Sequence, residues 1–146
     1  MNTRILTTAL ISLALYLLPL SSDAQCRAFT KNRCLPLLEG YVQNDNYNSA
    51  MLVPGDEAEL LLTFYGGKEY RLALCAHPIL GKVEYEVTDT SGETIYKGNS
   101  DSSNIFDFKM ANTQQLIVKL RVPVQQTTVS AHEGCVSVMV GSKELK

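Results

Sequence analysis

Apolar and polar residues alternate along most of the chain from residue 57 onward. In EAELLLTFY, residues 57–65, the apolar side chains Ala58, Leu60, Leu62 and Phe64 share one face, and EYRLALCA, residues 69–76, repeats the pattern. A period of two is typical of a half-buried β-strand. Because only the Gly66-Gly67 pair and Lys68 separate the two segments, we expect a β-hairpin over residues 57–76.

The same alternation predicts a series of further strands. They are KVEYEVTD at 82–89, ETIYK at 93–97, a strand carrying Phe106, Phe108 and Met110, QQLIVKLRV at 114–122, CVSVMVG at 135–141, and a short piece at 50–53. A second hairpin should turn at Ser91-Gly92. No apolar pattern of helical period lies between these strands. We therefore expect an all-β fold, an antiparallel β-sandwich of jelly-roll type with about eight strands.

The region before the strands has a different pattern. CRAFTKNRCLPLLEGY, residues 26–41, does not alternate and fits a short helix or an irregular clip broken near Pro36, followed by a polar loop. The predicted organisation is a signal peptide at 1–24, an N-terminal clip and loop at 25–49, and a β-sandwich domain at 50–146.

The first 24 residues are typical of a secretory signal peptide. Arg4 precedes an apolar run from Ile5 to Leu18, and small residues at Ser22 and Ala24 predict cleavage after Ala24. The run is shorter than the roughly 20 apolar residues that span a bilayer, so we expect no membrane insertion after cleavage. The predicted location is the periplasm or the extracellular space. Lipidation of Cys26 is an open alternative, although Gln25 stands where a small residue is usual.

Four cysteines, Cys26, Cys34, Cys75 and Cys135, follow the signal peptide. An even count in an exported chain predicts two disulfides. Cys75 and Cys135 lie on strand faces opposite the core, as do the apolar residues Leu61 and Ile117. We expect the clip to cover such an outer face. Of the three connectivities, the two that join the clip to the strands are favoured over a local Cys26–Cys34 bridge.

Charge excludes some partners. The chain has 13 basic and 15 acidic side chains and a net charge of −2, and the signal peptide removes one of each sign. The basic residues are scattered. Neither nucleic acid nor an anionic membrane surface is an expected partner.

Two short stretches could hold reactive chemistry. LCAHP and HEGC contain Cys75, His77, His132 and Cys135, whose sulfur and nitrogen atoms suit zinc, or a cysteine nucleophile with its base. Disulfide formation would use both sulfur atoms, so we expect no metal, no cofactor and no catalytic residue here. The chain also has no G-x-S-x-G and no H-E-x-x-H.

Oxygen-rich groups are the remaining candidates. The pairs Glu57/Glu59 and Glu84/Glu86 share strand faces and could serve a hydrolase, but are more typical of solvated outer faces. The loops GNSDSSN and NDNYN could hold calcium and assist carbohydrate binding, although both fit polar turns. Tyr41, Tyr47, Tyr65 and Tyr96 could stack on sugar rings.

Several segments resemble known proteins. CRAFTKNRCLPLLEGY, LVPGDEAELLLTFYGGKEYRLALC, TQQLIVKLRVP and GCVSVMVG are similar to an uncharacterised family of small exported bacterial proteins, which implies no particular activity. The middle of the chain resembles the jelly-roll sandwiches of the GOLD and pre-peptidase C-terminal type, which implies a binding or accessory module.

These observations together predict a non-enzymatic binding or accessory module of the bacterial cell envelope, stabilised by two disulfides. The expected partner is another envelope protein or a glycan. The alternatives are a metal-binding protein using Cys75, His77, His132 and Cys135, and a calcium-assisted carbohydrate-binding module. An edge strand such as IFDFKM or CVSVMV could also pair with a strand of a partner.

Overall fold

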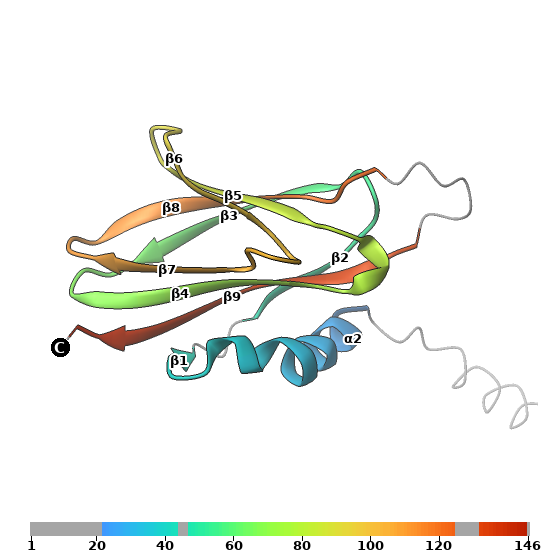
Figure 1. Cartoon of the computed structure of the whole chain (residues 1–146), viewed down its shortest axis with the longest axis horizontal. Helices are drawn as coiled ribbons and strands as arrows, with labels where there is room; N and C mark the ends of the chain where they lie inside the picture. The colour runs from blue at the N-terminus through green and yellow to red at the C-terminus, as the bar shows by residue number, and fades with distance from the viewer. Residues whose placement is uncertain (1–21, 44–46, 125–131, 146) are drawn as a thin grey trace, which may run out of the picture.

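The computed structural model describes residues 22–43, 47–124 and 132–145, which form two antiparallel sheets packed face to face (Figure 1). This confirms the predicted antiparallel β-sandwich. The described residues contain nine strands: β1 (Val42–Gln43), β2 (Asn48–Leu52), β3 (Glu57–Phe64), β4 (Lys68–Ala76), β5 (Glu84–Asp89), β6 (Thr94–Asn99), β7 (Ile105–Met110), β8 (Gln114–Arg121) and β9 (Gly134–Glu144).

The strands divide between a five-stranded and a four-stranded sheet. The five-stranded sheet has the order β1-β9-β4-β7, with β2 also paired to β9, and the four-stranded sheet has the order β3-β8-β5-β6. β1 and β2 pair with different stretches of β9, since Val42 lies opposite Ser142 and Asn48 opposite Val138. CVSVMV therefore lies inside β9, which has partners on both sides, and the prediction that it forms an edge is wrong. IFDFKM, which is β7, does form an edge.

The predicted hairpin over residues 57–76 is also wrong. β3 pairs with β8 in the four-stranded sheet, whereas β4 pairs with β7 and β9 in the five-stranded sheet. The Gly66-Gly67 pair thus carries the chain from one sheet to the other. Alternation alone could not distinguish the two arrangements, because both need a tight glycine turn between two strands.

A positive φ at Gly67 and close packing at Gly66 explain why this connection uses two glycines. Gly67 has a φ of 79° and its N–H donates to the Met110 carbonyl over 2.7 Å. A Cβ atom on Gly66 would lie 2.6 Å from the carbonyl oxygen of Ala111, which belongs to the loop between β7 and β8. The Tyr70 hydroxyl also bonds to both the N–H and the carbonyl of Tyr65, at 2.9 and 3.2 Å.

The second predicted hairpin is confirmed, because β5 and β6 are antiparallel neighbours. Asp89 closes its turn by accepting hydrogen bonds from the N–H groups of Ser91 and Glu93, at 2.8 and 2.9 Å. A hydrogen bond from the Ser91 side chain lowers the pKa of the Asp89 carboxyl most, and the backbone hydrogen bonds lower it further.

The main core lies between the two sheets. It is built mainly from the predicted inward faces of the strands, and its fully buried members include Phe64, Leu72, Leu74, Val83, Val87, Leu116, Val118, Val136 and Val138. The short helix η3 (Pro78–Leu80) adds Leu80, which the alternation did not predict. Burying such aliphatic side chains contributes roughly 1.5–3 kcal/mol each. The alternation read from the sequence therefore places the correct residues in the core.

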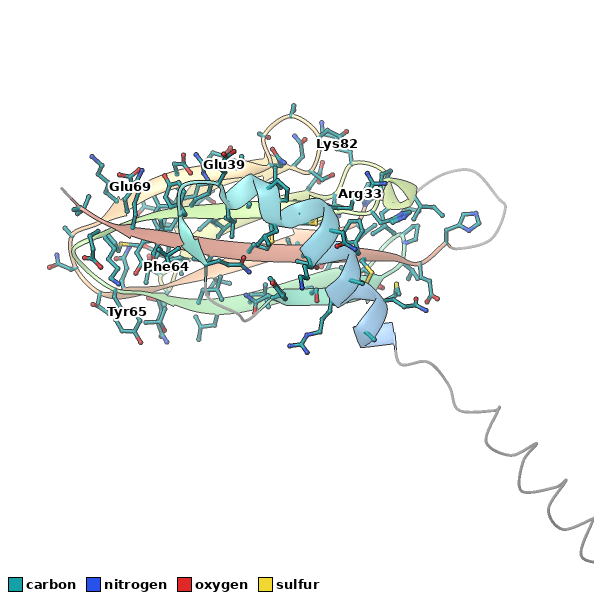
Figure 2. The ribbon with its side chains drawn as sticks, turned by 90° about the horizontal axis from the view of Figure 1, so that it is seen from below. Arg33, Glu39, Phe64, Tyr65, Glu69 and Lys82 are labelled. Atoms are coloured by element: carbon teal, nitrogen blue, oxygen red, sulfur yellow. A yellow bond between two sulfur atoms is a disulfide. The ribbon has the colours of Figure 1, made fainter. Side chains whose placement is uncertain are left out.

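The N-terminal clip consists of three consecutive helical segments: α2 (Ser22–Phe29), η1 (Thr30–Cys34) and η2 (Leu35–Leu38). They lie across the outer face of the five-stranded sheet, below β9 in Figure 1 and in front of it in Figure 2. Two disulfides join the clip to this sheet, Cys26–Cys135 to β9 and Cys34–Cys75 to β4. This is one of the two clip-to-strand connectivities expected from the sequence.

A second, smaller core lies between the clip and this sheet. Cys34 and Leu38 pack against Ala73 and Met139, all at most 3 % exposed. Nearby, the buried Thr30 hydroxyl donates to the Cys26 carbonyl over 2.7 Å and lies 2.5 Å from the Ser137 hydroxyl. The outer face of the five-stranded sheet is therefore occupied by the protein's own N-terminal segment.

The clip does not cover Leu61 and Ile117, contrary to expectation. These residues face each other on β3 and β8, in the four-stranded sheet, and Leu61 is 59 % exposed. The prediction was wrong because strand periodicity shows which residues point outward but not which sheet contains them.

Tyr41, three residues after the end of η2, anchors the C-terminal end of the clip to the five-stranded sheet. Its ring lies 4.6 Å from the Arg71 guanidinium carbon and 4.5 Å from the Lys143 ammonium, and its hydroxyl donates to Glu69 over 2.9 Å. Arg71 also donates two hydrogen bonds to Asp107, at 2.7 and 2.6 Å. These contacts tie the clip to β4, β7 and β9.

Stability is expected to fall as the pH is lowered from about 5 to about 3. The hydrogen bond from Arg71 holds the pKa of the Asp107 carboxyl below its ordinary value. As this carboxyl titrates, the folded state binds fewer protons than the unfolded chain. The stabilisation by the ion pair is therefore complete above the pKa of the carboxyl in the unfolded chain, and it is lost as the pH falls through the lower pKa of the folded state. Urea unfolding at several pH values should show a flatter profile for Arg71→Gln.

The matched control for this prediction is Lys82→Gln, which removes an exposed positive charge that makes no ion pair among the described residues. Its pH profile should follow that of the wild type. Equal slopes for Arg71→Gln and the wild type would contradict the assignment.

Most of the predicted signal peptide lies outside the described residues, and its last three residues begin α2. β1 and the start of β2 fall within residues 25–49, the range predicted as clip and loop. Among the described residues, no helix has both the length and the apolar character needed to cross a bilayer.

Candidate functional site

The two Cys-His stretches lie near each other but do not form the suggested quartet. Cys75 is bonded to Cys34 and Cys135 to Cys26, so neither sulfur atom is available as a thiolate. His77 accepts a hydrogen bond from the Ile79 N–H at 3.3 Å, and His132 is exposed. Within the described residues, no group of three or more His, Cys, Asp and Glu side chains is arranged to hold a metal.

The GNSDSSN loop, residues 98–104, uses its polar groups internally. The Asn99 side-chain oxygen accepts hydrogen bonds from the N–H groups of Asp101 and Ser102, both at 3.0 Å. The Ser103 hydroxyl accepts from the Asn99 N–H at 3.1 Å. This is the geometry of a polar turn. The NDNYN stretch lies partly outside the described residues.

The outer face of the four-stranded sheet is the open surface of the sandwich. It contains a hollow of about 680 Å³ that crosses all four strands of the sheet. Its lining residues are Glu57, Ala58, Glu59, Lys82, Glu84, Tyr85, Glu86, Lys97, Gly98, Asn99, Ser103, Lys119, Leu120 and Arg121. We call this hollow the sheet groove. A site that spans four strands can bind an extended ligand.

Strand pairing arranges the charges of the sheet groove in two rows. The register places opposite one another, from β3 to β6, the residues Glu57, Arg121, Glu84 and Asn99 in the first row and Glu59, Lys119, Glu86 and Lys97 in the second. Neighbouring strands lie about 4.8 Å apart, so each cation stands next to a carboxylate. The second row therefore alternates in sign across all four strands, and the first row alternates across three strands and ends on the uncharged Asn99.

Only some of these charges are paired within the protein. Arg121 lies 3.7 Å from Glu57 and Lys97 lies 3.2 Å from Glu86. A hydrogen bond from Thr94, followed by one from Lys97, lowers the pKa of the Glu86 carboxyl. Among the described residues Glu59 and Glu84 form no ion pair. These two carboxylates remain available to a ligand.

An apolar row borders the charged rows on the same face. Leu61 lies opposite Ile117, which lies opposite Thr88 on β5. Thr88 is only 2 % exposed, and its hydroxyl has no hydrogen-bond partner among the described residues. Thr88 is therefore not accessible, and Leu61 and Ile117 provide the apolar contacts that this face offers a ligand beside its charges.

A second hollow, of about 440 Å³, lies between the two sheets beside β3. We call it the side groove. Its wall includes Leu62, Phe64 and Tyr65 from the β3 end and Val42 and Val140 from the other sheet, and Tyr65 and Val42 are 62 % and 75 % exposed. Figure 2 shows Tyr65 near one end of the sandwich, well apart from Lys82, which lines the sheet groove.

No protein-family model and no curated protein matches the chain. Similar solved structures exist. Aeromonas hydrophila PliG, a periplasmic inhibitor of g-type lysozyme, has a TM-score of 0.48 and 10% identity, over 72% of this chain and 90% of that one. The CBM36-1 domain of a multidomain xylanase from the hindgut metagenome of Trinervitermes trinervoides has a TM-score of 0.35 and 11% identity, over 75% and 94%.

A de novo designed double-stranded β-helix is also similar, with a TM-score of 0.34 and 16% identity over 67% of this chain and 99% of that one. At these TM-scores the likenesses carry no functional argument. The candidate site is therefore defined by the geometry of this chain.

Sequence reasoning identified the glutamates of the sheet groove but treated Glu57/Glu59 and Glu84/Glu86 as separate solvated pairs. The structure brings all four onto one face, with β8 between them. The alternating Lys and Glu of KVEYE and the basic residues of VKLR were the available signal. The order of strands that joins them is not visible in the sequence.

Proposed function

We propose that this protein is an exported, non-enzymatic binding module of the cell envelope that binds its partner on the outer face of the four-stranded sheet. The observation behind the proposal is that one outer sheet face is covered and the other is open. One outer face is covered by a clip held by two disulfides, and the other bears a hollow of about 680 Å³. A sheet face left open in this way is available for recognition.

The chemistry of the sheet groove favours a polypeptide partner. Its charged rows contain both signs, which suits a protein surface with complementary charges. The only aromatic residue in its lining is Tyr85, which is 3 % exposed. Burial raises the pKa of Tyr85, so its hydroxyl remains neutral. A sugar ring in the sheet groove would find no exposed aromatic surface among the described residues of its lining.

A non-enzymatic role is supported by the surroundings of the acidic residues. Glu57 is 73 % exposed on its side chain and lies 3.7 Å from Arg121. A general acid in a glycosidase needs a buried carboxyl, because burial keeps it protonated. Export is supported by the two disulfides, which persist in oxidising compartments.

Reversing charge in the sheet groove tests the proposal. Lys119→Glu combined with Arg121→Glu should reduce capture of an envelope protein from a periplasmic or outer-surface extract by about tenfold or more. The acidic groups of the partner that pair with Lys119 and Arg121 would then meet glutamates and be repelled. The matched control is Lys109→Glu, an exposed lysine on β7 in the other sheet, which should retain capture. Thermal unfolding would verify that the variants fold.

Equal capture by the wild type and the double variant would contradict the proposal. A glycan array with and without a chelator tests the remaining alternative. Binding that needs calcium would favour a carbohydrate-binding module, and we expect the array to show none.

A further inference from the structure

The edges of the two sheets differ in how open they are. β1 and β2 are short, with two and five residues. The pairing of β6 shifts register between Val87 and Thr88. At the β7 edge, the Tyr96 hydroxyl donates to the Ile105 carbonyl over 3.4 Å and the Tyr96 ring stacks on Phe106 at 4.3 Å. Each of these features hinders the addition of another strand.

β3 is different, because it is long and regular and, among the strands that the structure describes, pairs only with β8. Its eight residues pair with β8 without interruption, from Glu57 opposite Arg121 to Phe64 opposite Gln114. The strand contains neither proline nor glycine. An edge of this kind is a template for pairing with another chain.

The hydrogen-bond pattern shows which backbone groups of β3 are free. Val122 N–H donates to the Asp56 carbonyl over 2.9 Å, just before β3 begins. In an antiparallel ladder, alternate residues point their backbone groups toward the same neighbour. The even-numbered residues of β3 therefore face β8. The N–H and carbonyl groups of Glu57, Glu59, Leu61 and Thr63 face the open side.

The charged rows of the sheet groove end at this edge. Read toward β3, they run Glu84, Arg121, Glu57 and Glu86, Lys119, Glu59. A strand added beside β3 would continue the alternation if it placed a basic residue next to each terminal glutamate. Opposite-charge pairs across neighbouring strands are favourable, by roughly 0.2–1 kcal/mol each.

The side groove lies along the same edge and would receive the other face of an added strand. Leu62, Phe64 and Tyr65 form one side of this hollow of about 440 Å³, and Val42 of β1 forms part of the other. Of the side chains that alternate with the basic residues, those beside Leu62 and Phe64, at the far end of β3 from Glu57, would point into it. Because Val42 and Tyr65 are largely exposed, apolar side chains would find a matching surface.

We infer that β3 binds an extended segment of a partner protein by strand addition, and that this segment alternates basic and apolar residues. The inference rests on the proposed function, since it names the partner class for the same sheet. A second copy of this chain fits poorly as the occupant. β3 contains no basic residue, and an antiparallel pairing of two β3 strands would place Glu57 and Glu59 opposite Thr63 and Leu61, so no cation would meet the terminal glutamates.

A synthetic peptide of alternating lysine and valine, about as long as the eight residues of β3, is the probe. In the wild type we expect saturable binding together with slower hydrogen exchange at the amides of Glu59 and Leu61, measured by NMR, because these amides would gain acceptors. The matched control peptide carries glutamate in place of lysine and should not bind.

Two variants separate the contributions. Glu57→Lys with Glu59→Lys should weaken binding of the lysine-valine peptide about tenfold or more, by charge reversal. Leu61→Pro removes an N–H on the open side while leaving the bonds to β8, so it should abolish binding in a folded protein. Should Leu61→Pro fail to fold, the amide exchange of the wild type decides.

The outcomes are distinct. Binding that leaves the Glu59 and Leu61 amides unprotected, or that survives in folded Leu61→Pro, overturns strand addition, and so does absence of binding. The proposed function is judged separately, by the effect of Lys119→Glu with Arg121→Glu on envelope-protein capture. If the double variant loses capture of the envelope protein but the lysine-valine peptide does not bind the wild type, the proposed function stands and strand addition is overturned.

Discussion

Replacing Cys26 and Cys135 together by alanine is expected to lower the free energy of unfolding by about 4 to 5 kcal/mol. The two cysteines are 109 residues apart, so their bond restricts most of the unfolded chain. They also fasten the start of the clip to β9, where Cys26 is 1 % and Cys135 6 % exposed. Urea unfolding of the oxidised proteins would measure the loss.

The second disulfide provides the internal comparison. Cys34 and Cys75 are 41 residues apart, and the same chain-entropy relation gives about 4 kcal/mol for their removal. Intact mass before and after reduction, followed by peptide mapping, would confirm which bonds each variant retains. A loss from Cys34→Ala/Cys75→Ala clearly larger than from Cys26→Ala/Cys135→Ala would contradict the loop-length argument.

The loss should begin at the clip. Without Cys26–Cys135, amide exchange in α2 should become faster while the central residues of β4 and β8 stay protected, because the clip packs only on the outside of the sandwich. Uniform acceleration across both sheets would mean that the clip and the sandwich unfold as one unit.

Leu74→Ala is expected to cost about 2 to 5 kcal/mol. Leu74 is fully buried at the centre of β4, opposite Val138, within the core between the sheets. Truncating it removes apolar burial and leaves a cavity in a closely packed region. Equilibrium unfolding in urea with an unchanged slope would report the difference as stability.

Leu61→Ala is the matched control, since it is the same substitution in the same type of alternating strand. Leu61 is 59 % exposed on the outer face of β3, so the expected change is within about 0.5 kcal/mol. Comparable losses at the two positions would place Leu61 in a core and contradict an open four-stranded sheet.

Covering one sheet and leaving the other open gives the two parts of the molecule different roles. The clip buries Ala73 and Met139, which would otherwise be an apolar outer face of the five-stranded sheet. The four-stranded sheet instead has Glu57, Glu59 and Leu61 on its free edge strand. We expect partner binding to depend on the second surface and stability on the first.

The sequence by itself determined where β3 to β9 lie and which side of each of these strands is buried, but not β1 or the start of β2. Alternation is a local property, because successive side chains of a strand point to opposite faces whatever the strand pairs with. Phe64, Leu72 and Val118 could therefore be assigned to the core, and Cys75 and Cys135 to outer faces. The N-terminal cover over those cysteines followed from their outward position.

Apart from the hairpin of β5 and β6, only the tertiary structure decided how the strands pair. Ladder hydrogen bonds join backbone groups that every residue type except proline carries in the same form, so the sequence contains little information about which distant strand lies beside which. The Gly66-Gly67 turn satisfies either a hairpin or a crossing between sheets, and the structure selects the crossing. That choice leaves β3 as an open edge. It also aligns Glu57 with Arg121 and Glu84, and such a row could not be read from the sequence because charges on separate strands form a row only after the strands are in register.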